Sequence, residues 1–189
     1  MARARPDTDL PRTLDDFRLW HQRQPATWEF IEGMPRMMAP GSLRHTLVKT
    51  NLAAALNVAL RGRPCLVLAD GAIVEVASSS LIPDIVVTCA EVDLAQPRVE
   101  EPLVVVEIAS PSSERDDLGH ELDLYLRHPA VRHYLFVSQE ERRLLHHERR
   151  ADGDGHFLAT IRTEGELVLD PPGITISLAD IWSNVPLPA

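Results

Sequence analysis

Residues 83–112 read PDIVVTCAEVDLAQPRVEEPLVVVEIASPS and hold two apolar runs, 84–90 and 103–109, joined by an acidic, proline-containing loop. The runs are rich in β-branched residues and too short for helices, so they predict two strands. Each carries one carboxylate: Asp84 begins the first run and Glu107 lies inside the second. If the two strands are neighbours in a sheet, these carboxylates can converge on one point.

The pattern on both sides of this stretch predicts an α/β domain with a mixed order of helices and strands. Apolar spacing and capping residues predict helices over about 13–24, 42–60 and 114–127, with capping boxes at Thr13/Asp16 and Ser113/Asp116. Further short runs with strand-like composition are predicted to be strands. The stretch ISLADIW near the C-terminus is expected to be a short helix or turn. The strand runs are WEFI and MPRMM around Gly33, then CLVLAD, AIVEVA, RHYLFVS, RRLLHHER, FLATIR and LVLD.

Length and composition indicate one soluble domain over residues 13–189, preceded by a flexible segment 1–12. No apolar run reaches the ~20 residues that cross a bilayer, so a cytoplasmic protein with no membrane contact is expected. The net charge of −9 excludes attraction of nucleic acid by the whole surface and leaves only local contacts. Cys65 and Cys89 lie in apolar runs and are expected to be buried thiols, without a disulfide or zinc site.

Glu107 is the strongest chemical signal, because a carboxylate with apolar neighbours on both sides needs a cation, a metal or a proton. Two converging carboxylates suit a hard divalent ion such as Mg²⁺, which can activate a water and neutralise charge on a phosphodiester. The alternative is structural: Glu107 pairs with an arginine and Asp84 caps a turn.

Several motifs occur in a fixed order along residues 13–150 and carry a resemblance to a known family. They are WEFIEGMPRMM at 28–38, His45 at the start of the long helix, Pro83-Asp84 before a strand, and Glu107 followed by Ser110-Pro111-Ser112. Together they resemble the PD-(D/E)XK nuclease superfamily, and within it the bacterial restriction endonuclease-like Uma-two group. No single motif is specific, whereas their order and spacing are.

The resemblance implies a restriction-endonuclease-like fold, with a mixed central β-sheet flanked by helices. It also implies a divalent metal, Mg²⁺ or Mn²⁺, held by Asp84, Glu107 and the carbonyl of Ile108, with Glu29 and His45 nearby. The implied activity is hydrolysis of nucleic acid, with DNA as the expected substrate and a homodimer as the expected assembly. For His45 the structural alternative is a helix-start residue bonded to the preceding turn, and Glu29 can equally be an ordinary half-exposed strand residue.

The chain departs from the family at the catalytic lysine. The superfamily slot two residues after Glu107 is Ala109, and the helix position that holds the lysine in the Uma-two group is Glu121. Three interpretations stay open. Lys49, the only lysine, lies one turn after His45 and can supply the charge; Glu121 can be a further ligand, with His120 or Arg115 supplying charge; or catalysis is lost and the fold serves binding or assembly.

The run EERRLLHHERR, residues 140–150, has adjacent glutamates and paired rather than alternating polarity. This pattern favours an ordinary solvated strand pair over a basic hairpin that touches phosphate backbones or a partner subunit. His146 and His147 are expected on the surface.

Overall fold

The computed structural model describes residues 10–109, 118–151 and 155–187. The described helices are α1 (Leu14–His21), α2 (Leu43–Ala59), α3 (Leu118–Arg127) and α4 (Leu178–Ile181). The described strands are β1 (Trp28–Ile31), β2 (Met34–Met37), β3 (Leu66–Ala69), β4 (Val74–Val76), β5 (Ser79–Leu81), β6 (Ile85–Thr88), β7 (Val104–Ile108), β8 (His133–Val137), β9 (Leu144–Arg149), β10 (Phe157–Arg162), β11 (Glu166–Leu169) and β12 (Ile174–Ser177).

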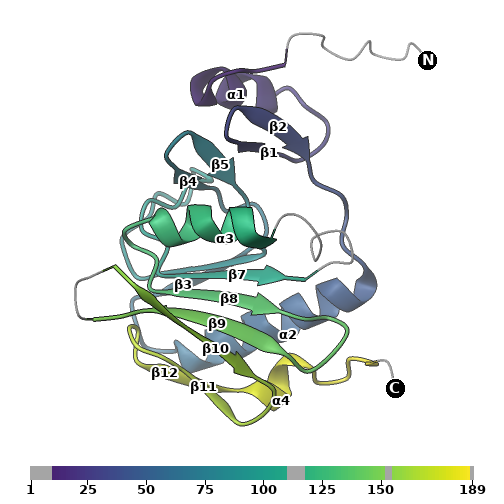
Figure 1. The fold of residues 1–189 in the computed structure, drawn as a ribbon, viewed down its shortest axis with the longest axis vertical. Coiled ribbons are helices and arrows are strands. Elements are labelled where there is room, and N and C mark those ends of the chain that lie inside the picture. The colour runs from purple at the N-terminus through teal and green to yellow at the C-terminus, as the bar shows by residue number, and fades with distance from the viewer. Residues whose placement is uncertain (1–9, 110–117, 152–154, 188–189) are drawn as a thin grey trace.

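A six-stranded sheet in the order β10-β9-β8-β7-β6-β3 forms the centre of the molecule. Its neighbours pair antiparallel except β7 and β8, which are parallel, so the sheet is mixed. Helix α3 lies over one face, while α2 and the β11-β12 hairpin lie over the other (Figure 1). The expected fold class, a mixed central sheet flanked by helices, is therefore confirmed.

Two apolar layers hold the helices on this sheet. On one face Leu52 and Leu56 of α2 pack in a cluster with Ile85 of β6, and all three are fully buried. On the other face Leu124 and Tyr125 of α3 pack in a second cluster. Because residues alternate between faces along a strand, each central strand contributes to both layers. Both layers are thus built from the apolar runs that predicted the strands.

A smaller sheet, in the order β2-β1-β5-β4, lies beyond α3 and carries α1 (Figure 1). Phe17 and Trp20 of α1 form a buried cluster with Phe30 of β1. The turn between β1 and β2 contains Gly33 at φ 88°, a backbone conformation that glycine adopts without strain. The predicted turn at this glycine is confirmed, and the small sheet places the β1-β2 hairpin beside α3.

Three elements differ from the prediction, in their bounds or in being present at all. α1 ends at His21 rather than near residue 24. β5 was not predicted, because its serine-rich sequence lacks the apolar signal of a strand. β12 occupies part of the stretch expected to be a short helix or turn, and α4 follows it. The predicted Ser113/Asp116 capping box and most of the segment 1–12 lie outside the described residues.

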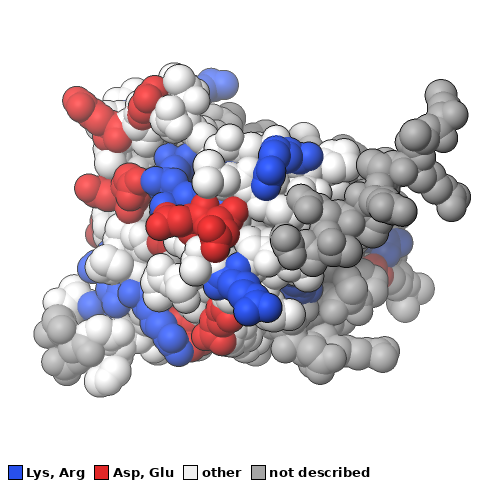
Figure 2. Space-filling view, turned by 90° about the horizontal axis from the view of Figure 1, so that it is seen from above, with Lys and Arg blue, Asp and Glu red and all other residues white. Residues whose placement is uncertain are grey.

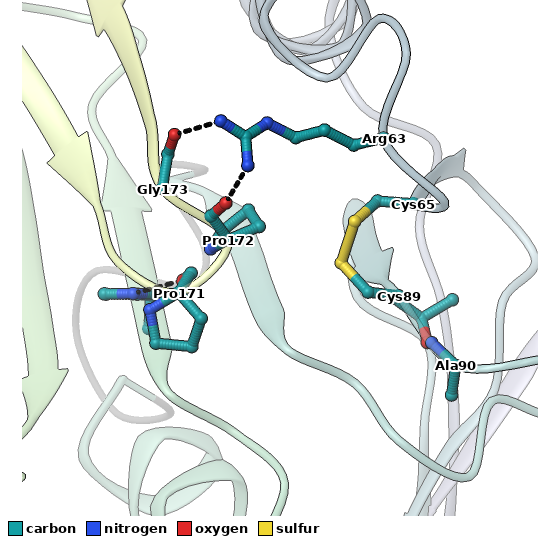
Figure 3. The surroundings of a disulfide bond; sticks show 9 residues. Arg63, Cys65, Cys89, Ala90, Pro171, Pro172 and Gly173 are labelled. Carbon is teal, nitrogen blue, oxygen red and sulfur yellow. Dashed lines mark hydrogen bonds between the residues drawn. A yellow bond between two sulfur atoms is a disulfide. The ribbon is translucent and has the colours of Figure 1, made fainter.

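Cys65 and Cys89 form a disulfide, so the expectation of two free thiols was wrong. β3 pairs with β6 through Leu66 opposite Thr88, and the cysteines occupy the next step of that ladder, with Cα atoms 4.0 Å apart. Beside them, Arg63 donates to the carbonyls of Pro172 and Gly173 at 2.6 Å each, which ties the β11-β12 turn to the start of β3 (Figure 3). Strand register, which the sequence alone does not give, brings the cysteines together.

His146 is buried, which corrects the prediction of a surface position. Its Nε2 lies 2.9 Å from Nδ1 of His133, whose Nε2 lies 2.9 Å from the Pro171 carbonyl. Burial is the main cause that lowers the pKa of His133 to about 4 and that of His146 to about 3. The pair is therefore neutral at physiological pH and belongs to the core under the β11-β12 turn.

Candidate active site

The candidate site lies where β6 begins and β7 ends. Ile85 pairs with Val106, so the next step of this antiparallel ladder sets Asp84 opposite Glu107. The backbone N–H of Ile108 donates to Oδ2 of Asp84 at 2.8 Å, which fixes this carboxylate against the end of β7. The structure thus places the two predicted carboxylates at the same end of two neighbouring central strands, near enough for the charge of Asp84 to raise the pKa of Glu107.

Helix α2 adds two basic side chains to Asp84. Ser42 caps the helix by accepting from the backbone N–H of His45 at 3.1 Å. Nε2 of His45 lies 3.1 Å from Oδ2 of Asp84, and Nζ of Lys49 lies 3.2 Å from Oδ1. His45 therefore has both of the roles considered for it, at the helix start and at the site. Lys49 also contacts Asp70, at the end of β3, at 2.5 Å.

Lys49 is not a solvent-directed surface lysine, since only 14% of its side chain is exposed. Burial acts to lower its pKa, but the hydrogen bond that Lys49 donates to Asp70 and the charge of Asp84 outweigh burial, and the net pKa is raised. Burial likewise acts to raise the pKa of Asp84, but His45, the Ile108 N–H and Lys49 lower it overall. Asp84 is thus an anion and Lys49 a cation near neutral pH.

Glu107 has the opposite electrostatic environment. Part of the residue stays solvent-accessible, yet burial is the largest cause that raises its pKa well above the ordinary value. The negative charges of Asp84, Glu121 and Glu29 raise this pKa further. In the absence of an added cation, Glu107 therefore keeps its proton to a higher pH than an ordinary glutamate, whereas Asp84 loses its proton more readily than an ordinary aspartate.

Tyr125 of α3 donates from its hydroxyl to Oε1 of Glu107 at 2.9 Å. Burial and the negative charge of Glu107 raise the pKa of Tyr125 well above its usual value, so the hydroxyl stays a donor. Within the described parts of the chain, no arginine pairs with Glu107 or Asp84, so the arginine clamp is not observed among those residues.

Glu121, at the family lysine position, lies one helical turn before Tyr125. It pairs with Arg36 of β2 at 2.9 Å, and Arg36 stands opposite Glu29 in the β1-β2 ladder. Glu29 is buried rather than half-exposed, and its Oε1 accepts from the backbone N–H of Ile82 at 2.9 Å. The hairpin therefore supplies both an arginine and a further carboxylate beside Glu121.

Two other cations, His120 and Arg115, were considered for Glu121. His120 is 43% exposed and contacts Glu32 at 3.4 Å, and Arg115 lies outside the described residues. Sequence reasoning did not single out Arg36 or Asp70. A signal existed for each, because Arg36 follows the hairpin glycine at the position facing Glu29, and Asp70 ends a predicted strand.

Charge on the face in Figure 2 occurs in small acidic and basic groups, and no continuous basic surface covers the described residues drawn there. This agrees with the net charge of −9. Within residues 10–109, 118–151 and 155–187, no three His, Cys, Asp or Glu side chains are arranged to hold a metal. No helix in those ranges has the length and apolar character to cross a membrane.

The donor set still fits a hard dication that keeps several of its waters, because such ions need only one or two protein carboxylates. Asp84 and Glu107 supply two carboxylates whose charges interact, and the Ile108 carbonyl follows Glu107 at the end of β7. Burial is the main cause of the raised pKa of Glu107, and an excess of negative charge from Asp84, Glu121 and Glu29 adds to it. A dication would offset that excess in place of the Glu107 proton.

A family model described as "Uma2: Putative restriction endonuclease" matches residues 14–180. The chain belongs to the Uma2 family. The uncharacterized protein slr1290 of Synechocystis is 27% identical over 184 residues, which cover 95% of this chain and 96% of that protein. The match confirms the resemblance found in the motifs, and it makes the departure at Glu121 a departure within Uma2.

A crystal structure of a putative nuclease belonging to DUF820 from Anabaena variabilis has a TM-score of 0.75 to this Uma2 chain. The sequence identity is 16%, and the similarity covers 92% of this chain and 98% of the other. At this identity the similarity shows the fold, which is therefore a nuclease-type fold along nearly the whole chain.

Proposed function

We propose that this Uma2 chain is a divalent-metal-dependent endonuclease that hydrolyses phosphodiester bonds of nucleic acid, with DNA as its substrate. The observation that supports the proposal is that Asp84 contacts both Lys49 of α2 and the backbone N–H of Ile108, the residue after Glu107. The ladder sets the two carboxylates opposite each other, and the ammonium lies 3.2 Å from Asp84.

In this proposal Asp84, Glu107 and the Ile108 carbonyl hold Mg²⁺ or Mn²⁺. When bound, such an ion supplies Lewis acidity, which offsets negative charge on a phosphodiester and makes a water more acidic. Asp84 ionises more readily than an ordinary aspartate, whereas Glu107 holds a proton more tightly than an ordinary glutamate and must be deprotonated to bind the ion. In this proposal Asp84 is ionised before the metal binds, and Glu107 exchanges its proton for the metal ion.

Lys49 takes the part that a lysine on the following helix has elsewhere in the family. Its ammonium is fixed between Asp70 and Asp84, so it is oriented toward the site before substrate binds. A fixed cation that faces developing negative charge stabilises a transition state without reorganising. His45, on the preceding turn, holds the opposite oxygen of Asp84 and orients that carboxylate.

A plasmid-nicking assay with Mg²⁺ or Mn²⁺ tests the proposal. Asp84→Asn and Glu107→Gln should each abolish metal-dependent cutting. Asp93→Asn and Glu100→Gln are matched controls, because both make the same chemical change on the exposed loop between β6 and β7 and should cut like the native protein. Equal cutting by Asp84→Asn and native protein would show that the nuclease activity does not come from this site.

A second candidate function is binding or assembly without catalysis, and Glu121 is the observation that favours it. The notable variant is Glu121→Lys, which restores the family lysine. Arg36 lies 2.9 Å from Glu121, so this change alone sets two cations side by side. The informative variant is therefore Arg36→Gln combined with Glu121→Lys. DNA binding without cutting by the native protein, together with cutting by the double variant, would identify a nuclease fold retained for binding.

We further propose a cytoplasmic homodimer, in which two sites face the two strands of a duplex. Light scattering on the purified chain tests the dimer. Disulfides are rare in reducing compartments, so trapping the thiols of Cys65 and Cys89 in intact cells tests the location. Free thiols at both positions support the cytoplasm, and a complete disulfide opposes it.

A further inference from the structure

Gln139 lies two residues after the end of β8 and is almost completely buried, with 2% of its surface exposed. Its Nε2 donates to the carbonyl of Ala109 at 2.5 Å. Its Oε1 accepts from the hydroxyl of Ser42 at 2.7 Å. A carbonyl can only accept, so the contact with Ala109 fixes which end of the amide is the donor. Both ends of the amide are therefore engaged, each by a different element.

These two contacts connect the two halves of the candidate site. Ala109 comes directly after Ile108 and two residues after Glu107, at the end of the strand that bears the buried carboxylate. Ser42 caps α2, and its Oγ also accepts from the backbone N–H of His45 at 3.1 Å. Through one amide, the first turn of α2 is held against the end of β7.

We propose that Gln139 is a positioning residue, which sets His45 and Lys49 of α2 relative to Asp84 and Glu107. This inference rests on the proposed function. An amide is needed because the Ala109 carbonyl requires a donor and the Ser42 hydroxyl requires an acceptor. Glutamate keeps the acceptor and loses the donor, whereas methionine has a similar length and offers neither.

A neighbouring contact provides an internal comparison. Arg44 of α2 pairs with Glu140 at 2.7 Å, and both side chains are more than 30% exposed. This pair links the same helix turn to the same loop, but solvent screens it and exposed pairs contribute little. Gln139 is thus the contact that fixes the geometry, and Glu140→Gln is its control.

A second control separates positioning from general stability. Asn51 of α2 donates to the carbonyls of Ile181 and Ser183 at 3.1 Å and 2.8 Å. Asn51→Leu therefore removes two hydrogen bonds of an amide on the same helix, away from the Asp84 contacts. It should lower the melting temperature without changing the candidate site.

The experiment compares Gln139→Met, Gln139→Glu, Glu140→Gln and Asn51→Leu with the native chain. Nicking kinetics with Mn²⁺ give kcat and KM, and ¹⁵N chemical shifts of the His45 ring report its contact with Asp84 without any turnover. Misplacement of about 1 Å can cost about 100-fold in rate. We expect Gln139→Met to lower kcat 10- to 100-fold with KM within about threefold, and to shift the His45 ring resonances. Gln139→Glu should fall between Gln139→Met and native, and both controls should keep native kcat and resonances.

Native kcat and native His45 resonances in a folded Gln139→Met variant would overturn the inference. So would an equal loss of kcat in Asn51→Leu, because the effect would then be one of stability. If the native chain does not cut DNA, the proposed function fails, and the His45 resonances alone decide whether Gln139 positions α2.

Discussion

Replacing Glu107 by glutamine should make the metal-free protein more stable, and increasingly so as the pH rises. The folded-state pKa of Glu107 is raised well above its ordinary value of 4.5, chiefly by burial and then by the charges of Asp84, Glu121 and Glu29. A group with a raised folded pKa contributes its full stability below the unfolded pKa and loses it as the pH rises through the folded pKa. Glutamine has no proton to lose and can still accept from Tyr125.

The size of the effect follows from the cost of an anion at this position. An ionised carboxylate without a paired cation in a protein interior costs several kcal/mol, and the remaining solvent contact of Glu107 reduces that cost. We therefore expect a gain on the order of 2 kcal/mol in the free energy of unfolding for Glu107→Gln at pH 9. The gain should vanish near pH 4, where both states of the native protein carry the proton.

Urea unfolding of both proteins between pH 4 and pH 9, with chelator present, measures this difference. Other titrating groups are shared, so the difference isolates position 107. A second series with Mn²⁺ at pH 8 should stabilise the native protein, by about 2.7 kcal/mol at one hundred times the dissociation constant, and leave Glu107→Gln unchanged. A difference that stays constant across the pH range would refute the assigned protonation of Glu107.

Three further outcomes are expected. Lys49→Met should lower kcat in the nicking assay at least about 100-fold. The affinity for Mn²⁺, measured by calorimetry, should stay the same or rise, because the ammonium that competes for Asp84 is gone. A fall in this affinity with unchanged kcat would contradict the role of Lys49. Replacing Cys65 and Cys89 together by alanine should lower the free energy of unfolding by about 3 kcal/mol, since their separation of 24 residues closes a loop whose entropy the disulfide removes from the unfolded chain. Leu52→Ala, at a fully buried position of α2, should cost about 2 to 5 kcal/mol in denaturant unfolding, and a cost under 1 kcal/mol would place Leu52 outside the core.

The central layers could be predicted because local sequence determines them. The β-branched runs around Asp84 and Glu107 predict strands. Ser42, a capping residue followed by apolar residues at helical spacing, predicts the start of a helix. β5 could not be predicted in this way, because Ser79 and Ser80 are buried by their neighbours in space and carry no apolar pattern.

Pairings distant in sequence account for the other differences. Arg36 meets Glu121 across 85 residues, and neither residue signals the other in the chain. The disulfide depends on the register of β3 against β6, and register is a property of the assembled sheet. The burial of His146 depends on the β11-β12 turn that covers it, through the carbonyl of Pro171 bonded to His133. Local pattern thus identifies the elements, and their mutual placement decides which polar groups meet.

Asp84 lies opposite Glu107 at the step that follows the last recorded pair of the β6-β7 ladder, so the site depends on the number of residues in each of these two strands. Side chains alternate between faces, so deleting one residue inside β6 or β7 would reverse the face to which one carboxylate points and change its position relative to the other. The loop that connects the two strands can change in length without this effect, because it starts and ends outside the paired residues. Insertions there leave the two acids facing each other, which makes this loop the natural place to graft new segments and the strands the place where length cannot vary.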